Sequence, residues 1–268
     1  MSIEYRTYGS SGPWAILLHG GPGAAGYLAP VARELAGSFR VIEPFQRRGS
    51  AEKPVTIVDH IENLRELIAA QCGQERPALA GHSWGAMLGL CYAARYTDTV
   101  CGVVLVGNGT FDPASRQRLE EIRKERMGPE MRRRISELPR TVADPDKRLA
   151  LLGKWMKQID SVDLIDEVMP EVCFDALGHD QIWADMIRLQ RQGVYPEAFR
   201  KISCPAVMLH GAEDPHPGRM IYENLRQYIH QLEYLEFARC GHYPWLEMAA
   251  REEFYTVLKR WLIENSGL

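Results

Sequence analysis

The stretch ALAGHSWGAM, residues 78–87, places a serine between two glycines at the spacing G-x-S-x-G. An apolar run leads into it, and the small-residue helical pattern AMLGLCYAAR, residues 86–95, follows it. A sharp turn from a strand into a helix strains the central residue, and side chains two positions away on either side would collide. Gly81 and Gly85 remove that collision, so the pattern predicts that Ser83 stands clear of the sheet as a nucleophile. The alternative is a small-residue turn that only packs a helix against a sheet.

Similar short apolar runs recur along the chain, at residues 15–18, 40–42, 103–106, 206–209 and 234–237. Several carry apolar residues at consecutive positions, which a strand needs only when both of its faces are covered. Helical patterns alternate with these runs, at residues 29–36, 58–72, 86–95, 220–228 and 251–264. This alternation predicts an α/β fold with a doubly wound, mostly parallel sheet.

The alternation stops between residues 109 and 196, where charged helix formers dominate and no convincing strand is found. Prolines are expected to break this stretch into several helices, at Pro113, Pro129, Pro139, Pro145 and Pro170. We therefore expect a helical cap, or lid, over residues 109–196. The α/β core would then consist of residues 1–108 and 197–268. Three aromatic residues of the lid are candidates for lining a substrate pocket, although such residues more often pack a lid onto its core: Trp155, Phe174 and Trp183.

Composition excludes several classes of function. The chain is 46% hydrophobic and 25% charged, with a net charge of −3, and has no basic stripe with interleaved aromatic residues, so nucleic acid is not expected as a partner. The charge cluster at residues 116–134 mixes both signs at helical spacing, as a solvated helix face does. No run is long enough for a membrane span, and the N-terminus does not resemble a signal peptide. The six cysteines are scattered, which argues against a zinc site and indicates reduced thiols in a cytoplasmic protein.

A nucleophilic serine needs a base, and the base needs an acid that orients it. His242, in ARCGHYPWLE, lies in a turn just past the apolar run at residues 234–237, at the same edge of the sheet as Ser83. Asp214, in VMLHGAEDPHP, follows the run at residues 206–209 at that edge as well. The adjacent Glu213 is the alternative acid. We expect Ser83, Asp214 and His242 to form a catalytic triad.

A second glycine-rich turn, HGGPG at residues 19–23, follows the apolar run WAILL. Such a turn could hold a phosphate or another developing negative charge with its backbone N–H groups. It lacks the Lys-Ser/Thr of a P-loop and the spacing of a dinucleotide turn, so no nucleotide cofactor is expected. We expect instead an oxyanion hole formed by the backbone N–H groups of Gly21 and Trp84, because Pro22 has no N–H to donate.

Ser83, Asp214 and His242, in this order and with a lid inserted between core strands, resemble the α/β-hydrolase fold family over nearly the whole chain. Within that family, HGGPG, FQRRGS (residues 45–50) and GHSWG are similar to the proline iminopeptidase branch. Phe45 stands where that branch usually has Asp, and His82 where it usually has Gly.

The resemblance implies that acidic lid residues hold the free amine of a peptide substrate. The candidates for this role are Glu167, Glu171, Asp175, Asp180 and Asp185.

The expected function is that of a serine hydrolase that cleaves a small-molecule ester or amide through an acyl-enzyme, without a metal or another cofactor. One alternative is a proline iminopeptidase that releases an N-terminal residue from peptides. The other is a receptor for a small molecule, on the same fold and with little turnover.

Overall fold

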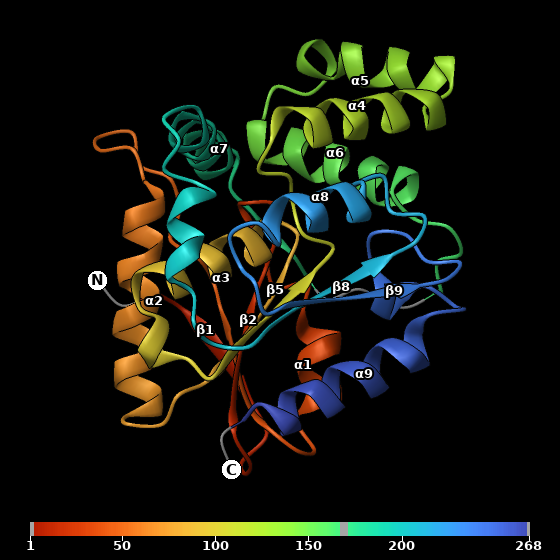
Figure 1. Cartoon of the computed structure of the whole chain (residues 1–268). Helices are drawn as coiled ribbons and strands as arrows, with labels where there is room; N and C mark the ends of the chain where they lie inside the picture. Colours follow the sequence, from red (N-terminus) through yellow and green to blue (C-terminus); the bar gives the residue numbers. More distant parts are fainter. Residues whose placement is uncertain (1–2, 167–170, 267–268) are drawn as a thin grey trace.

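The computed structural model describes residues 3–166 and 171–266. One seven-stranded sheet forms its centre, with the strand order β1-β4-β2-β5-β6-β8-β9 (Figure 1). The strands are β1 (Tyr5–Tyr8), β2 (Trp14–Leu18), β4 (Arg40–Pro44), β5 (Ala78–His82), β6 (Gly102–Val106), β8 (Ala206–Gly211) and β9 (Leu232–Phe237). Only the edge strand β1 is antiparallel to its neighbour, and the other pairs are parallel. The expected α/β fold with a mostly parallel sheet is confirmed.

Helices cover both faces of this sheet. One face carries α1 (Ala29–Leu35) and α9 (Arg251–Glu264), and the other carries α2 (Ile57–Cys72), α3 (Trp84–Arg95) and α8 (Gly218–Leu225). Alternate residues of β2 divide between them, since Ile16 and Leu18 pack toward α2 and α3 whereas Ala15 and Leu17 pack toward α1 and α9. Both sets of side chains are buried, which is why the strand sequences are apolar at consecutive positions.

Four further helices lie between β6 and β8 in the chain: α4 (Pro113–Arg126), α5 (Pro129–Thr141), α6 (Pro145–Ile159) and α7 (Ala176–Arg191). Figure 1 shows α4, α5 and α6 grouped together, well away from α1 and α9. Each of these three begins with a proline, whose missing N–H costs nothing in the first turn of a helix. Pro139 does not break a helix as expected but lies inside α5, near its end, where only the hydrogen bond from residue 139 to the carbonyl of Ile135 is missing. Pro170 lies outside the described residues.

The helical segment also contains a short strand that the sequence did not indicate. β7 (Cys173–Phe174) pairs antiparallel with β3 (Ala24–Ala25), which lies just after the HGGPG turn. Two residues are too few for a periodicity to be visible in the sequence. The pairing attaches the helical segment directly to the loop that follows β2.

No helix in residues 3–166 and 171–266 is long and apolar enough to cross a membrane. All six cysteines are free thiols, and four of them are buried.

Candidate active site

Ser83 occupies the turn between β5 and α3 in a strained conformation, with φ 55° and ψ −117°. Its backbone N–H donates to the carbonyl of Val106 at 2.8 Å, which ties the turn to the end of β6. A Cβ atom at Gly81 would lie 2.2 Å from the carbonyl oxygen of Gly85, and one at Gly85 would lie 1.9 Å from that of Leu18. Any side chain at either glycine would therefore push the turn apart, as the sequence pattern predicts.

The HGGPG turn lies directly beside this serine. A Cβ atom at Gly20 would come within 3.0 Å of the Cβ of Ser83. The amide of Trp84 belongs to the first residue of α3, which has no acceptor within its own helix. In the described part of the chain, no group accepts a hydrogen bond from the amides of Gly21 or Trp84. Both amides therefore remain available to a negative charge formed near Ser83.

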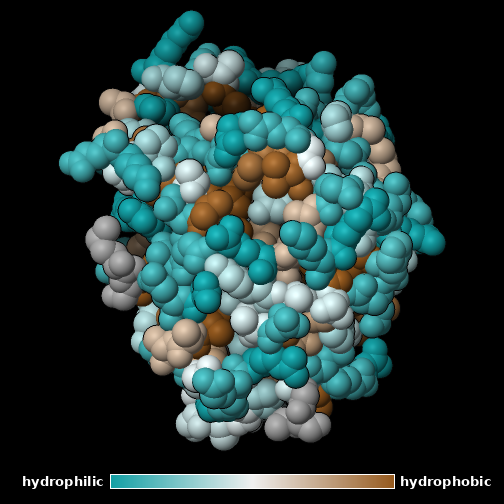
Figure 2. All heavy atoms as spheres, turned by 60° about the vertical axis from the view of Figure 1, so that its left-hand side comes forward, coloured by the Kyte–Doolittle hydropathy of each residue, from teal (hydrophilic) through white to brown (hydrophobic). Residues whose placement is uncertain are grey.

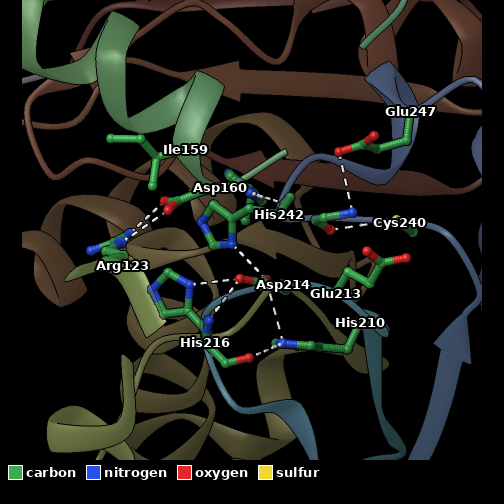
Figure 3. Close-up of polar contacts among 12 residues, drawn as sticks. Arg123, Ile159, Asp160, His210, Glu213, Asp214, His216, Cys240, His242 and Glu247 are labelled. Carbon is green, nitrogen blue, oxygen red and sulfur yellow. Dashed lines mark hydrogen bonds and ion pairs between the residues drawn. The ribbon is translucent and has the colours of Figure 1, made fainter. Parts of the chain in front are cut away.

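Asp214 and His242 form a buried pair (Figure 3). The Nδ1–H of His242 donates to Oδ2 of Asp214 at 2.7 Å, and the two residues are only 3% and 6% exposed. Because the carboxylate can only accept, Nδ1 carries the proton and Nε2 keeps its lone pair. Burial alone would raise the pKa of Asp214, but the surrounding histidines outweigh it and hold that pKa well below its usual range. The alternative acid, Glu213, has an exposed side chain.

Ser83 and His242 lie on either side of the end of β6. A Cβ atom at Gly107, the residue after β6, would be 2.9 Å from Nδ1 of His242. The hydroxyl of Ser83, however, makes no hydrogen bond to His242 or to any other described residue. The structure thus joins the expected acid to the expected base and leaves the expected nucleophile unbonded. Catalytic hydrogen bonds of this kind often form fully only when substrate binds.

A hydrogen-bond chain through His82 connects the three segments of the site. Tyr27 Oη accepts from the N–H of Gly20 at 2.7 Å, so its own proton goes to Nδ1 of His82 at 2.6 Å. Nε2–H of His82 must then be the donor to the carbonyl of His242, at 2.9 Å. Burial keeps the pKa of His82 well below its usual value, so this ring is neutral. The residue before Ser83 thereby links the HGGPG turn to the loop that carries His242.

A second histidine on Asp214 was missed by the sequence interpretation. Both the backbone N–H and the Nδ1–H of His216 donate to Oδ1 of Asp214, each at 2.9 Å. The signal was present in DPHP, since an aspartate often accepts from the backbone two residues further on in a turn. In the described residues, Asp214, His216 and His242 have donor atoms within 4.8 Å of one another, close enough to hold a metal ion.

The three aromatic candidates from the helical segment lie in different surroundings. The ring of Trp183 packs edge-on against that of Trp84, with the ring centroids 5.9 Å apart, and so reaches the residue next to Ser83. Trp155 is 7% exposed and lies beneath the guanidinium of Arg134. Phe174 lines a cavity of about 360 Å³.

That cavity lies between the helical segment and the core. Its walls come from the HGGPG turn, the loop after β4, and helices α2 and α7, with His19, Phe45 and His60 among the lining residues. Ser83 and His242 are not among the lining residues. Figure 2 views the molecule from the side of α2 and shows a hollow where apolar side chains gather among hydrophilic ones.

The acidic residues that the resemblance suggested for binding an amine differ in their surroundings. Asp175 and Asp185 are occupied. Asp175 accepts from the backbone N–H of Gly49, and Asp185 accepts from that of Ile57, so both join α7 to the core. Glu171 and Asp180 are exposed, and Glu167 lies outside the described residues.

Comparison with known proteins supports a common origin with hydrolases of this fold. Residues 15–255 match the model of the "Alpha/beta hydrolase family". The chain is 28% identical over 116 residues to the cis-3-alkyl-4-alkyloxetan-2-one decarboxylase of Shewanella oneidensis, covering 41% of this chain and about a third (36%) of that protein. It is 27% identical over 276 residues to the proline iminopeptidase of Lactobacillus crispatus, covering 93% of this chain and 90% of that one.

Among solved structures, a thermophilic esterase from Thermogutta terrifontis superposes with a TM-score of 0.64 at 18% identity, covering 98% of this chain and 94% of the esterase. At that identity the similarity shows the fold alone.

Proposed function

The chain belongs to the alpha/beta hydrolase family, and from that premise we propose that it is a serine hydrolase acting on a small-molecule ester or amide. The observation that carries the proposal is the buried Asp214–His242 pair at 2.7 Å, at the same sheet edge as the strained Ser83. The pair fixes the imidazole tautomer that a general base requires.

In the proposed reaction, Oγ of Ser83 attacks the substrate carbonyl carbon while Nε2 of His242 takes the hydroxyl proton. The negative charge that forms on the carbonyl oxygen is held by the amides of Gly21 and Trp84. The bond to the leaving group then breaks, and His242 returns its proton to that group. Water then attacks the acyl carbon while Nε2 of His242 accepts one of its protons. The bond to Oγ of Ser83 breaks, the acid product leaves, and His242 returns the proton to Oγ.

We also propose that residues 109–196 act as the lid of this site, with Trp183 at the boundary of the substrate space. Its ring contact with Trp84 connects this lid to the residue that follows Ser83.

A direct test is hydrolysis of p-nitrophenyl acetate and butyrate in large molar excess over the protein. The proposal predicts many turnovers per chain, which Ser83→Ala abolishes. A burst of one equivalent followed by no further release would instead indicate a receptor that forms a stable adduct.

Proline iminopeptidase activity is the second candidate. It is supported by the relative from Lactobacillus crispatus and by a contact between two of the motifs that suggested it. Nε1 of Trp84 donates to Oε1 of Gln46 at 2.8 Å, so the GHSWG and FQRRGS segments meet beside the nucleophile. Cleavage of a prolyl arylamide, lost when the proline nitrogen is acetylated, would establish this activity. Equal rates with both compounds would exclude a requirement for the free amine.

A further inference from the structure

Two histidines share the carboxylate of Asp214, and we propose that the second, His216, is a positioning residue for the reaction of His242. The inference rests on the proposed function, because a positioning role has meaning only if His242 is the base. It concerns how the carboxylate and the imidazole are held, which the triad alone does not explain.

The first part of this role is to fix the carboxylate. Oδ1 of Asp214 accepts two hydrogen bonds, from the backbone N–H and from Nδ1–H of His216. Oδ2 accepts from His242 at 2.7 Å and lies 3.4 Å from Nε2 of His210. A carboxylate held by a single oxygen can rotate about its Cβ–Cγ bond. The two bonds to Oδ1 oppose that rotation, so Oδ2 stays directed at His242.

The second part is to fix the ring of the base. The imidazoles of His216 and His242 are stacked, with centroids 4.3 Å apart and planes 16° from parallel. Figure 3 shows both rings with Nδ1 directed at the same carboxylate, so that both Nε2 atoms are directed away from it. A flat neighbour at this distance prevents the His242 ring from turning out of the plane in which Nε2 faces the substrate.

His216 is itself firmly held and uncharged. Nε2–H of the fully buried His210 donates to its carbonyl at 2.9 Å, and Pro215 and Pro217 restrict the backbone on both sides. Burial lowers the pKa of His216 to about 4. At neutral pH the ring therefore places no positive charge beside His242, where it would oppose the imidazolium that forms during the reaction.

Three substitutions separate the two parts of this role: His216→Ala, His216→Asn and His216→Phe. We expect His216→Ala to lower kcat for p-nitrophenyl butyrate about tenfold while KM changes less than twofold. His216→Asn, whose amide N–H can reach Oδ1, should recover kcat to within about threefold of the wild type. His216→Phe keeps the stacking and loses the donor, and its kcat should lie between those of the other two. His230→Ala, at an exposed histidine, is the control and should leave kcat unchanged.

The Asp214→Ala background distinguishes positioning from a purely structural role. Because the effect of His216 acts through Asp214, adding His216→Ala there should change kcat less than twofold. A further tenfold loss in that background would overturn the inference. Wild-type kcat in all three single variants would also overturn it, as would a His216→Asn variant that recovers none of the kcat lost in His216→Ala. A loss of kcat in His216→Asn as large as that in His242→Asn would show that His216 is the base, and would overturn the inference as well.

Circular dichroism and thermal melting establish that each variant is folded. If His216→Ala does not fold, the comparison of His216→Asn with His216→Phe carries the test, since Asn alone keeps the donor. Wild-type activity in Ser83→Ala would defeat the proposed function itself. An inactive Ser83→Ala, together with fully active His216 variants, would defeat only this inference.

Discussion

Nδ1 of His242 donates to Oδ2 of Asp214 at 2.7 Å, and both side chains are almost completely buried. Their short contact at the carboxyl edge of the sheet fixes the proton on Nδ1 and leaves Nε2 as the basic atom. The loop that carries His242 is held in turn by the end of α6, since the backbone N–H of His242 donates to the carbonyl of Asp160 at 2.8 Å.

Asp214→Asn should abolish most of the activity while preserving the fold. An asparagine can present its N–H to Nδ1 of His242, which places the histidine proton on Nε2 and removes the base. In a serine protease the equivalent change lowers kcat about 10⁴-fold, and we expect a loss of similar order in ester hydrolysis. A kcat within tenfold of the wild type would show that Asp214 does not orient the base.

Tyr27→Phe should lower both stability and kcat. The change leaves the N–H of Gly20 without its acceptor and Nδ1 of His82 without its donor, and unsatisfied buried groups cost about 1–3 kcal/mol each. Urea unfolding and steady-state kinetics measure the two effects. The control is Tyr92→Phe, which removes one hydrogen bond of a buried tyrosine, with Thr99, near the end of α3 that is remote from Ser83. It should lower stability and leave kcat unchanged; an equal effect of both variants on kcat would refute a role for the His82 chain.

Stability should fall as the pH is lowered from about 6.5 toward 4. Burial lowers the pKa of His19, His60 and His216 to about 4 in each case, and it lowers those of His82 and His210 as well. In the unfolded chain these groups titrate near 6.5. Across this interval the unfolded state therefore binds more protons, and the free energy of unfolding decreases with decreasing pH. The stabilisation is fully present above about pH 6.5. Below that pH, the contribution of each histidine to the free energy of unfolding decreases by at most about 1.4 kcal/mol per pH unit.

Urea titrations at pH 7.5, 6.5, 5.5 and 4.5 measure this dependence. His60→Gln removes one of the buried histidines and should make the decline less steep. A decline that is equally steep in this variant, or a free energy of unfolding that rises as the pH falls, would contradict the assignment of neutral buried histidines.

Elements whose apolar residues follow a clear pattern could be predicted from the sequence. The strands of the parallel sheet were predicted because both faces are buried, and α9 was predicted with its observed bounds, Arg251–Glu264. The edge strand β1 was missed, since its residues alternate between exposed and half-buried positions and are polar or aromatic rather than uniformly apolar. Pairing between β3 and β7 depends on segments far apart in the chain, which local patterns do not show.

The candidate site could be predicted in part. G-x-S-x-G and the positions after β8 and β9 indicated Ser83, Asp214 and His242 because the ends of parallel strands meet at one edge of the sheet. The contact of His216 with Asp214 is local and DPHP indicates it, but the stacking of His216 on His242 depends on how two loops approach each other. Likewise, the hydrogen-bond partner of the His82 ring is Tyr27, which lies 55 residues earlier in the chain.

Labelling with a fluorophosphonate tests whether Ser83 is an activated nucleophile, because this reagent reacts covalently with an activated serine. We expect one adduct per chain in the native protein, located on Ser83 by mass spectrometry of its peptide, and no adduct in Ser83→Ala. A folded Ser83→Ala protein that is still labelled, or an adduct on any other residue, would contradict this expectation.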